Sequence, residues 1–334
     1  MSTKTPRNNV YDFLKFIGLS AIILAHVNPP SIIMMVRSFD VPLMVFMSAL
    51  LARFSYEKKN GIDRQPIKYV ISRAKCLVFP TWIFLTLYFL TLFIITRKVE
   101  RIGFYIASYD LTQYGFGYVW IILIYLYVSI LVPVFHKCSF SLRCIAIVVL
   151  IYCIYELSYC FQIGIQNKIV ETTFYYIIPY GTVAFIGYNY PSIKSKKRCT
   201  IFALSSILFV FLFIYYWIIN GEPQLVKIAK YPPRIYYLSY GIMCSFAFLM
   251  LCEKFPKKWF GNSFFTYVSS HSMWIYLWHI LWLVIYEKLG LPYIWYIKYL
   301  VVYLGAIITV LITNKFLDII EKHITFPSFK YLRG

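Results

Sequence analysis

A lysine and a histidine lie inside the first strongly apolar stretch of the chain, residues 10–28. Lys15 and His26 are eleven residues apart, which on an α-helix is about three turns plus roughly 20°, so both side chains share one face. Along the helix axis they are about 16 Å apart, roughly half the thickness of a bilayer core. A cation and an imidazole in a lipid-embedded helix cost several kcal/mol unless protein or water receives them. The spacing therefore indicates a site within the membrane, where His26 can serve as a general base.

Each of these residues also has a structural interpretation. A neighbouring helix can satisfy a buried histidine, and Lys15 can extend to the inner interface instead of holding an anionic group. Arg37 and Asp40 frame the loop that follows the apolar stretch. Asp40 can pair with Arg37 at the surface, or it can polarise His26 as carboxylates do for catalytic imidazoles. The sequence leaves both alternatives open.

A second polar stretch lies near the C-terminus, where Ser272, Tyr276 and His279 recur at spacings of four and three. These spacings put the three side chains on one helix face. They can line a cavity or bond across helices, as serines in membrane helices often do. With Arg37 and Glu156, Tyr276 and His279 are our candidate substrate-binding residues.

Arg73 and Lys75 precede the apolar run 76–96. Basic side chains at the entrance of a helix suit phosphate groups, including those of a nucleotide-like cofactor. The alternative is that they anchor the helix on the cytoplasmic side, as basic residues commonly do.

The composition describes a membrane protein. Of 334 residues, 60% are hydrophobic and only 14% charged, whereas a soluble domain carries about a quarter. The net charge of +20 does not indicate nucleic-acid binding, because the basic residues sit in short loops between apolar runs, where topology and anionic headgroups explain them. Eight cysteines without CxxC spacing support neither a disulfide framework nor a zinc site.

Apolar runs long enough to span a bilayer predict an all-α, polytopic membrane protein with about ten transmembrane helices. The loops are too short for a folded soluble domain, so residues 1–334 form a single membrane domain. The predicted spans lie near residues 10–28, 40–54, 76–96, 117–134, 144–162, 172–190, 200–219, 234–252, 264–286 and 296–317.

The loop charges predict the orientation. With the N-terminus inside, inner segments carry more than twice as many lysines and arginines as outer segments, which favours cytoplasmic N- and C-termini. Lys15 then lies toward the cytoplasm. His26, Asp40, Glu156 and His279 then lie in the outer half of the membrane.

In order and spacing these motifs resemble the acyltransferase 3 family of bacterial polytopic membrane O-acyltransferases. Lys15 and His26 fit the family's motif of a basic residue, ten residues and a histidine. The other matching segments are Phe39-Asp40-Val41-Pro42, Arg73 to Pro80, Trp120, Tyr231-Pro232-Pro233-Arg234 and Ser272 to His279.

The resemblance implies transfer of an acyl group, usually acetyl, from cytoplasmic acyl-CoA to a hydroxyl of an envelope sugar. Lys15 and His26 fall on the family's essential pair. Arg73 falls on the first arginine of an Arg-x-x-Arg motif, but Cys76 stands where the second would be, and Lys75 is the candidate replacement. Many relatives carry a fused extracytoplasmic esterase-like domain that we do not find in this chain.

We therefore expect a multi-pass O-acetyltransferase of a bacterial cytoplasmic membrane, with His26, Lys15 and Asp40 as catalytic residues. Acetyl-CoA or another acyl-CoA is expected as donor substrate, with Arg73 and Lys75 on its phosphates, and with no bound cofactor and no metal. The expected partners are membrane lipid, a sugar or glycan acceptor and polysaccharide biosynthesis machinery. The alternatives are a flippase or exporter of a lipid-linked sugar, and a non-catalytic subunit of a polysaccharide assembly complex.

Overall fold

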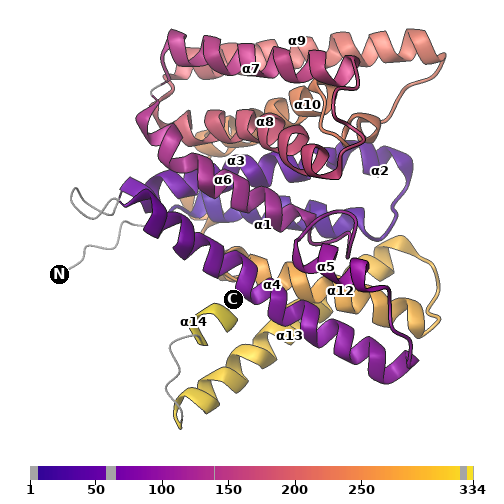
Figure 1. Cartoon of the computed structure of the whole chain (residues 1–334). Coiled ribbons are helices and arrows are strands. Elements are labelled where there is room, and N and C mark those ends of the chain that lie inside the picture. The colour runs from indigo at the N-terminus through magenta and orange to yellow at the C-terminus, as the bar shows by residue number, and fades with distance from the viewer. Residues whose placement is uncertain (1–6, 58–64, 139, 324–328, 334) are drawn as a thin grey trace. The chain divides into compact units, whose positions relative to one another are not determined.

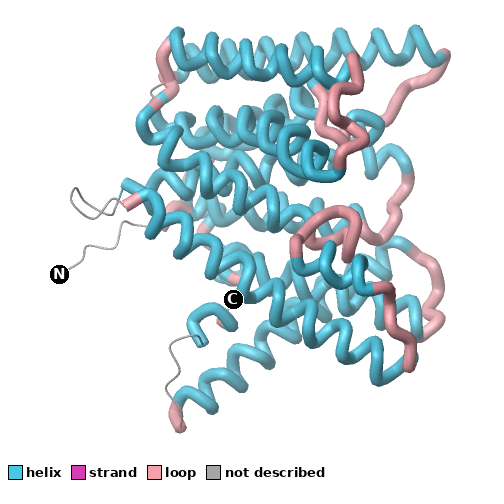
Figure 2. The backbone as a smooth tube through the Cα atoms, viewed as in Figure 1, coloured by secondary structure: helices cyan, strands magenta, loops and turns pink. Residues whose placement is uncertain are grey.

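The structure is a computed structural model that describes residues 7–57, 65–138, 140–323 and 329–333. Within these residues every regular element is an α-helix or a short 3-10 helix (Figure 1). Short loops join long helices, as Figure 2 shows. The prediction of an all-α protein is therefore confirmed.

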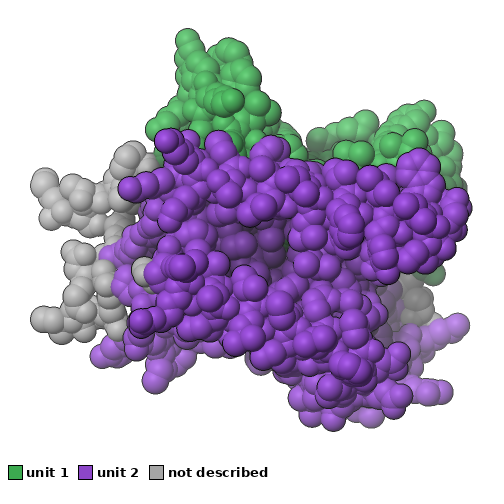
Figure 3. All heavy atoms as spheres, turned by 90° about the horizontal axis from the view of Figure 1, so that it is seen from above, with its two compact units in different colours: residues 1–44, 244–334 green, residues 45–243 purple. Residues whose placement is uncertain are grey.

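The chain divides into two compact units, which Figure 3 colours separately. Unit 1 comprises residues 1–44 and 244–334, and unit 2 comprises residues 45–243. The helices α3 (Asp40–Glu57) and α10 (Ile235–Lys254) contribute to both units. Unit 1 also holds α1 (Asn9–Ala25), α2 (Ser31–Val36), η1 (Arg37–Phe39), η5 (Lys257–Phe260), α11 (Ser263–Ser270), α12 (Ser272–Lys288), α13 (Trp295–Glu321) and α14 (Phe329–Leu332).

Unit 2 holds the remaining helices, several of which start at residues that favour a helix N-terminus. The side chains of Ser141 and Asn167 accept hydrogen bonds from the first turns of α7 and α8, and Pro66 opens α4. The helices are α4 (Pro66–Thr96), α5 (Ile102–Tyr109), α6 (Trp120–Lys137), α7 (Leu142–Cys160), α8 (Lys168–Asn189), η3 (Tyr190–Ser192), α9 (Ser195–Asn220) and η4 (Val226–Ala229).

Eight of the described helices are long and apolar enough to cross a membrane. The pair α11–α12 makes a ninth span if its two helices, bent by 80° at the break between them, are taken together. α1 has 17 residues and ends at Ala25. A polytopic membrane protein is thus confirmed, while the total of ten spans and the cytoplasmic position of the termini stay predictions.

Two predicted spans differ from the structure. The expected span 264–286 is broken at His271, because α11 ends at Ser270 and α12 starts at Ser272 in a new direction. The third span begins well before residue 76, since α4 starts at Pro66. Arg73 and Lys75 therefore lie inside a helix and not ahead of it.

Within each unit a few helix pairs form the core. In unit 1, α12 packs along α13, and α1 packs against η5, α11, α12 and α13. In unit 2, α6 packs against α4 and α8, and α7 packs against α8. α7 and α9 each bury one residue, Tyr155 and Ser205, and present apolar side chains outward, as helices in contact with lipid do.

Gly187 of α8 gives a test of this packing. A Cβ atom at Gly187 would lie 2.5 Å from the backbone oxygen of Phe46 in α3, and backbone atoms cannot move aside as a flexible side chain does. We expect Gly187→Ala to lower the stability by about 1–3 kcal/mol. The measurement is the thermal unfolding midpoint of the purified protein in detergent.

Gly103→Ala in α5 is the matched control, because a Cβ atom there has no neighbour within 4 Å. We expect it to unfold at the temperature of the wild type or slightly above. Equal midpoints for the two variants would contradict the close approach of α8 to α3.

Candidate active site

The side chains of Lys15 and His26 both contact the α11–α12 pair, as expected for residues on one face of a helix. The Lys15 Nζ donates to the carbonyl oxygen of Ser269 in α11, at 2.6 Å. The His26 Nδ1 lies 2.8 Å from the Nε2 of His279 in α12. His26 itself follows the last residue of α1, and its backbone N–H donates to Ile23.

The two histidines form a stacked and hydrogen-bonded pair. Their ring centroids are 5.0 Å apart and their planes differ by 13°. The His279 side chain has no exposed surface, and its Nδ1 contacts the backbone carbonyl oxygen of Tyr276. The predicted polar face of α12 therefore provides the partner of His26.

The carbonyl of Tyr276 determines where the protons of this pair lie. A carbonyl oxygen can only accept, so the Nδ1 of His279 carries a proton and, in the neutral ring, its Nε2 is an acceptor. That acceptor takes the Nδ1–H of His26, so in the neutral ring the Nε2 of His26 is unprotonated. When a hydrogen bond to one ring nitrogen fixes the tautomer of a catalytic histidine, the other nitrogen can act as a base.

Lys15 lies inside α1, about three turns before His26. Its acceptor, Ser269, belongs to the last turn of α11, where the carbonyl groups have no partner within the helix and a cation is favoured. Lys15 thus stabilises the end of α11 at the break before α12.

Asp12, which the sequence analysis did not single out, joins the same cluster. Its side chain is buried and accepts from the hydroxyl of Ser269, at 2.6 Å. It also accepts from Arg7, whose guanidinium in turn donates to the carbonyl of Thr266. The hydrogen bond to Asp12 raises the pKa of Arg7, so this partner remains charged. A carboxylate three residues before Lys15 in an apolar stretch was the signal available in the sequence.

Asp40 pairs with Arg37, which is one of the two alternatives left by the sequence. The pair is not at the surface, however, because Asp40 is 1% exposed and Arg37 6%. Buried charges persist only when paired, and this pair holds η1 to the first turn of α3. The Nδ1 of His26 has its hydrogen bond to His279.

The other predicted residues belong to unit 2. Arg73 is half-buried, and its buried Nε has no hydrogen-bond partner among the described residues. Lys75 is exposed. Glu156 accepts from the Nε of Arg234 at 2.5 Å and from the backbone N–H of Ile235 at 2.9 Å, so it anchors the start of α10.

The structure thus forms two clusters along α1. His26 lies with His279 and Tyr276, and Lys15 lies with Ser269 and Asp12 further along the helix. The described residues contain no group of three or more His, Cys, Asp or Glu side chains that would hold a metal ion. What the arrangement offers chemically is a base, the Nε2 of His26, whose tautomer is set by a second ring.

The proton positions of the histidine pair can be measured. The measurement is the NMR spectrum of protein labelled with ¹⁵N-histidine, in lipid at pH 8. We expect the Nδ1 of His26 to be protonated and its Nε2 to be unprotonated. His279→Phe removes the acceptor, and we expect the proton of His26 to move toward Nε2. The exposed His323 should give the same spectrum in both proteins. An unchanged His26 spectrum would contradict the proton positions assigned to the histidine pair.

Comparison with known proteins identifies the family of the chain. A family model described as an acyltransferase domain matches residues 8–314 of the chain, a range that includes α1, the α11–α12 pair and most of α13. No curated protein and no solved structure matches the chain. Because the family model covers nearly the whole sequence, this multi-pass membrane protein belongs to the acyltransferase 3 family.

Proposed function

We propose that the protein transfers an acyl group, acetyl in the first instance, from acyl-CoA to a hydroxyl of a cell-surface polysaccharide, glycolipid or lipid-linked sugar. The observation that carries this proposal is the hydrogen-bonded chain from Tyr276 through His279 to His26. It leaves one imidazole nitrogen of His26 unprotonated, which is what activation of a hydroxyl requires.

The reaction then follows from this base. The Nε2 of His26 takes the hydroxyl proton while the acceptor oxygen attacks the thioester carbonyl. The new C–O bond forms, the C–S bond breaks, and the thiolate of CoA leaves and receives the proton from His26. During the step His26 is an imidazolium whose Nδ1–H remains bound to His279, so the ring keeps its orientation. Because a thioester is already activated, these residues need no metal for the chemistry.

Lys15 supplies positive charge further along α1, where the carbonyl of Ser269 accepts a hydrogen bond from it. We assign to it stabilisation of negative charge on the acyl-CoA donor. It does not reach a tetrahedral intermediate at His26, because about 16 Å along the helix separates the two residues. Asp40 acts indirectly in this proposal, because its pair with Arg37 fixes the helix that follows the loop after His26.

Arg73 and Lys75 are the proposed contacts for the phosphates of CoA. The buried Nε of Arg73 is a donor for which a phosphate oxygen is the fitting acceptor. Lys75, two residues further along α4, adds an exposed charge. We place the protein in the cytoplasmic membrane of a bacterium, with these residues on the cytoplasmic side and with polysaccharide biosynthesis machinery as its partner.

Replacement of His26 tests the proposed chemistry. Membranes that hold wild type or His26→Ala at matched levels receive acetyl-CoA with a labelled acetyl group, and the label is followed into the glycan fraction. We expect the variant to lose at least about 100-fold of the transfer rate, the usual contribution of a general base. His323→Ala is the control, because His323 is exposed beyond the end of α13 and has no part in the hydrogen-bonded chain from Tyr276 to His26.

Equal transfer by wild type and His26→Ala would remove His26 from the mechanism. Absence of transfer by both proteins, with the native acceptor present, would contradict the proposal that the protein is an acyltransferase for this acceptor. Export of an unmodified sugar that depends on the wild-type protein would then favour a flippase.

Replacement of Arg73 tests the proposed donor contacts. Loss of a hydrogen bond to a charged group costs about 1.5–3 kcal/mol, so we expect Arg73→Ala to raise the KM for acetyl-CoA by about tenfold or more, with a smaller rise for Lys75→Ala. Lys68→Ala, an exposed residue of the same helix, should leave KM unchanged. Equal KM values for all three variants would exclude these contacts.

A further inference from the structure

The segment that carries His26 lies beyond the last residue of α1, where the regular hydrogen bonds of the helix end. Val27 is fully buried. Asn28 has a positive φ of 51°, a conformation that asparagine tolerates better than most residues. The contact with His279 holds the ring of His26 from one side. The backbone of the segment determines where the ring can lie, so the contacts that hold this segment affect the proposed base.

Asn28 connects the segment to the loop between α12 and α13. Its Nδ2 donates to the hydroxyl of Tyr293, at 2.8 Å. Tyr293 lies in residues 289–294, which join the two helices. Both residues belong to unit 1, although the chain between them passes through the whole of unit 2.

A buried cation holds the ring of Tyr293. Lys298, near the start of α13, is 1% exposed, and its Nζ donates to the Oε1 of Glu287 at 2.9 Å. The Nζ lies 5.3 Å from the ring centre of Tyr293 and 5.9 Å from that of Tyr286, within the range at which an aromatic ring attracts a cation. Tyr293 is therefore held at its ring by Lys298 and at its hydroxyl by Asn28.

Stability alone does not explain the burial of Lys298. The side chain of Glu287 is 65% exposed, and a pair with an exposed carboxylate contributes at most about 1 kcal/mol. Removal of an ammonium group from water costs several kcal/mol, of which the two tyrosine rings offset a part. Buried charges of this kind can instead serve to fix one arrangement of the chain.

α12 thus holds the segment at two points. Through His279 it binds the ring of His26 directly. Through Glu287 and Lys298 it holds the tyrosine that binds Asn28, two residues after that ring. Two contacts at different points restrict the orientation of the ring more than one contact does.

We propose that Asn28 and Tyr293 are positioning residues for His26, and that Lys298 keeps Tyr293 in the required orientation. These residues act through His26 and not on the substrate. The assignment rests on the proposed function, because a base takes a proton efficiently only when its nitrogen is held within hydrogen-bond reach of the hydroxyl.

The rate of acetyl transfer tests the positioning. The assay uses membranes with the native acceptor glycan and saturating acetyl-CoA. We expect Asn28→Ala and Tyr293→Phe each to lower kcat by about tenfold with an unchanged KM for acetyl-CoA, because a displaced base slows the chemical step and leaves donor binding intact. The double variant should lose no more than either single variant, since both changes remove the same hydrogen bond.

Two further replacements separate the hydrogen bond from the backbone conformation. Asn28→Gly retains the positive φ and removes the amide, so we expect it to be as slow as Asn28→Ala. Asn28→Asp also tolerates this φ, and its carboxylate can accept from the hydroxyl of Tyr293, so it should restore most of the wild-type rate. Tyr296→Phe is the matched control and should equal the wild type, because Tyr296 is an exposed tyrosine of α13 in the same unit.

The ¹⁵N spectrum of His26 provides a measurement without turnover. We expect its signals to broaden or split in Asn28→Ala, because the ring then takes more than one orientation, whereas the exposed His323 should give the signals of the wild type. The thermal unfolding midpoint should stay that of the wild type, since Asn28 and Tyr293 are both exposed. A lowered midpoint with unchanged His26 signals would make the contact merely structural.

Four outcomes would overturn the assignment. They are a wild-type kcat in Asn28→Ala, no recovery in Asn28→Asp, additive losses in the double variant, and unchanged His26 signals. The proposed function fails separately. If the wild type transfers no acetyl group to the glycan, the acyltransferase proposal fails, and the His26 spectra still decide whether Asn28 positions the ring.

Discussion

A polar side chain inside a membrane helix must find its partner within the protein, and unit 1 is arranged around that constraint. Asp12, Lys15 and His26 all belong to the α1 region, which is predominantly apolar. Each is received by the α11–α12 pair, through Ser269 or His279. The helix break at His271 makes both contacts possible. It exposes the carbonyl end of α11 to Lys15 and starts α12 in the direction of His26.

The constraint also explains why the histidine pair is suited to chemistry. A hydrogen bond to a backbone carbonyl cannot be reversed, since a carbonyl has no proton to give. The proton of His279 is therefore fixed by the helix itself, and the proton of His26 follows from it. In a carboxylate-histidine pair a charge performs this task, whereas here a neutral ring does, which avoids the cost of another buried charge.

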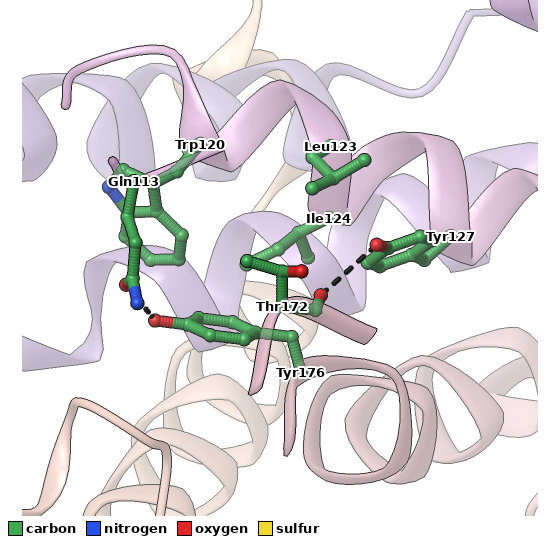
Figure 4. Close-up of a pocket in the computed structure, with 7 residues that line it drawn as sticks. All are labelled: Gln113, Trp120, Leu123, Ile124, Tyr127, Thr172 and Tyr176. Atoms are coloured by element: carbon green, nitrogen blue, oxygen red, sulfur yellow. Dashed lines mark hydrogen bonds between the residues drawn. The ribbon is translucent and has the colours of Figure 1, made fainter. Parts of the chain in front are cut away.

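Unit 2 uses its polar residues differently. Its partly buried network around Gln113 and Glu171 consists of amide, carboxylate and phenol groups, of which Figure 4 shows Gln113 and Tyr176. Amide and phenol groups both donate and accept, and an ionised carboxylate accepts, so these groups satisfy one another. The stacked imidazole pair, in contrast, belongs to unit 1.

The sequence by itself determined the class of protein and one face of α1. Hydrophobic runs must become membrane helices, and a spacing of eleven residues must bring Lys15 and His26 to the same side, because both depend only on local geometry. The partner of His26, the burial of the Arg37–Asp40 pair and the part of Asp12 were decided by tertiary structure. The contacts of Asp12 and His26 join segments more than 250 residues apart. The burial of Asp40 depends on which helix covers its loop. The periodicity of a single helix carries no information about either.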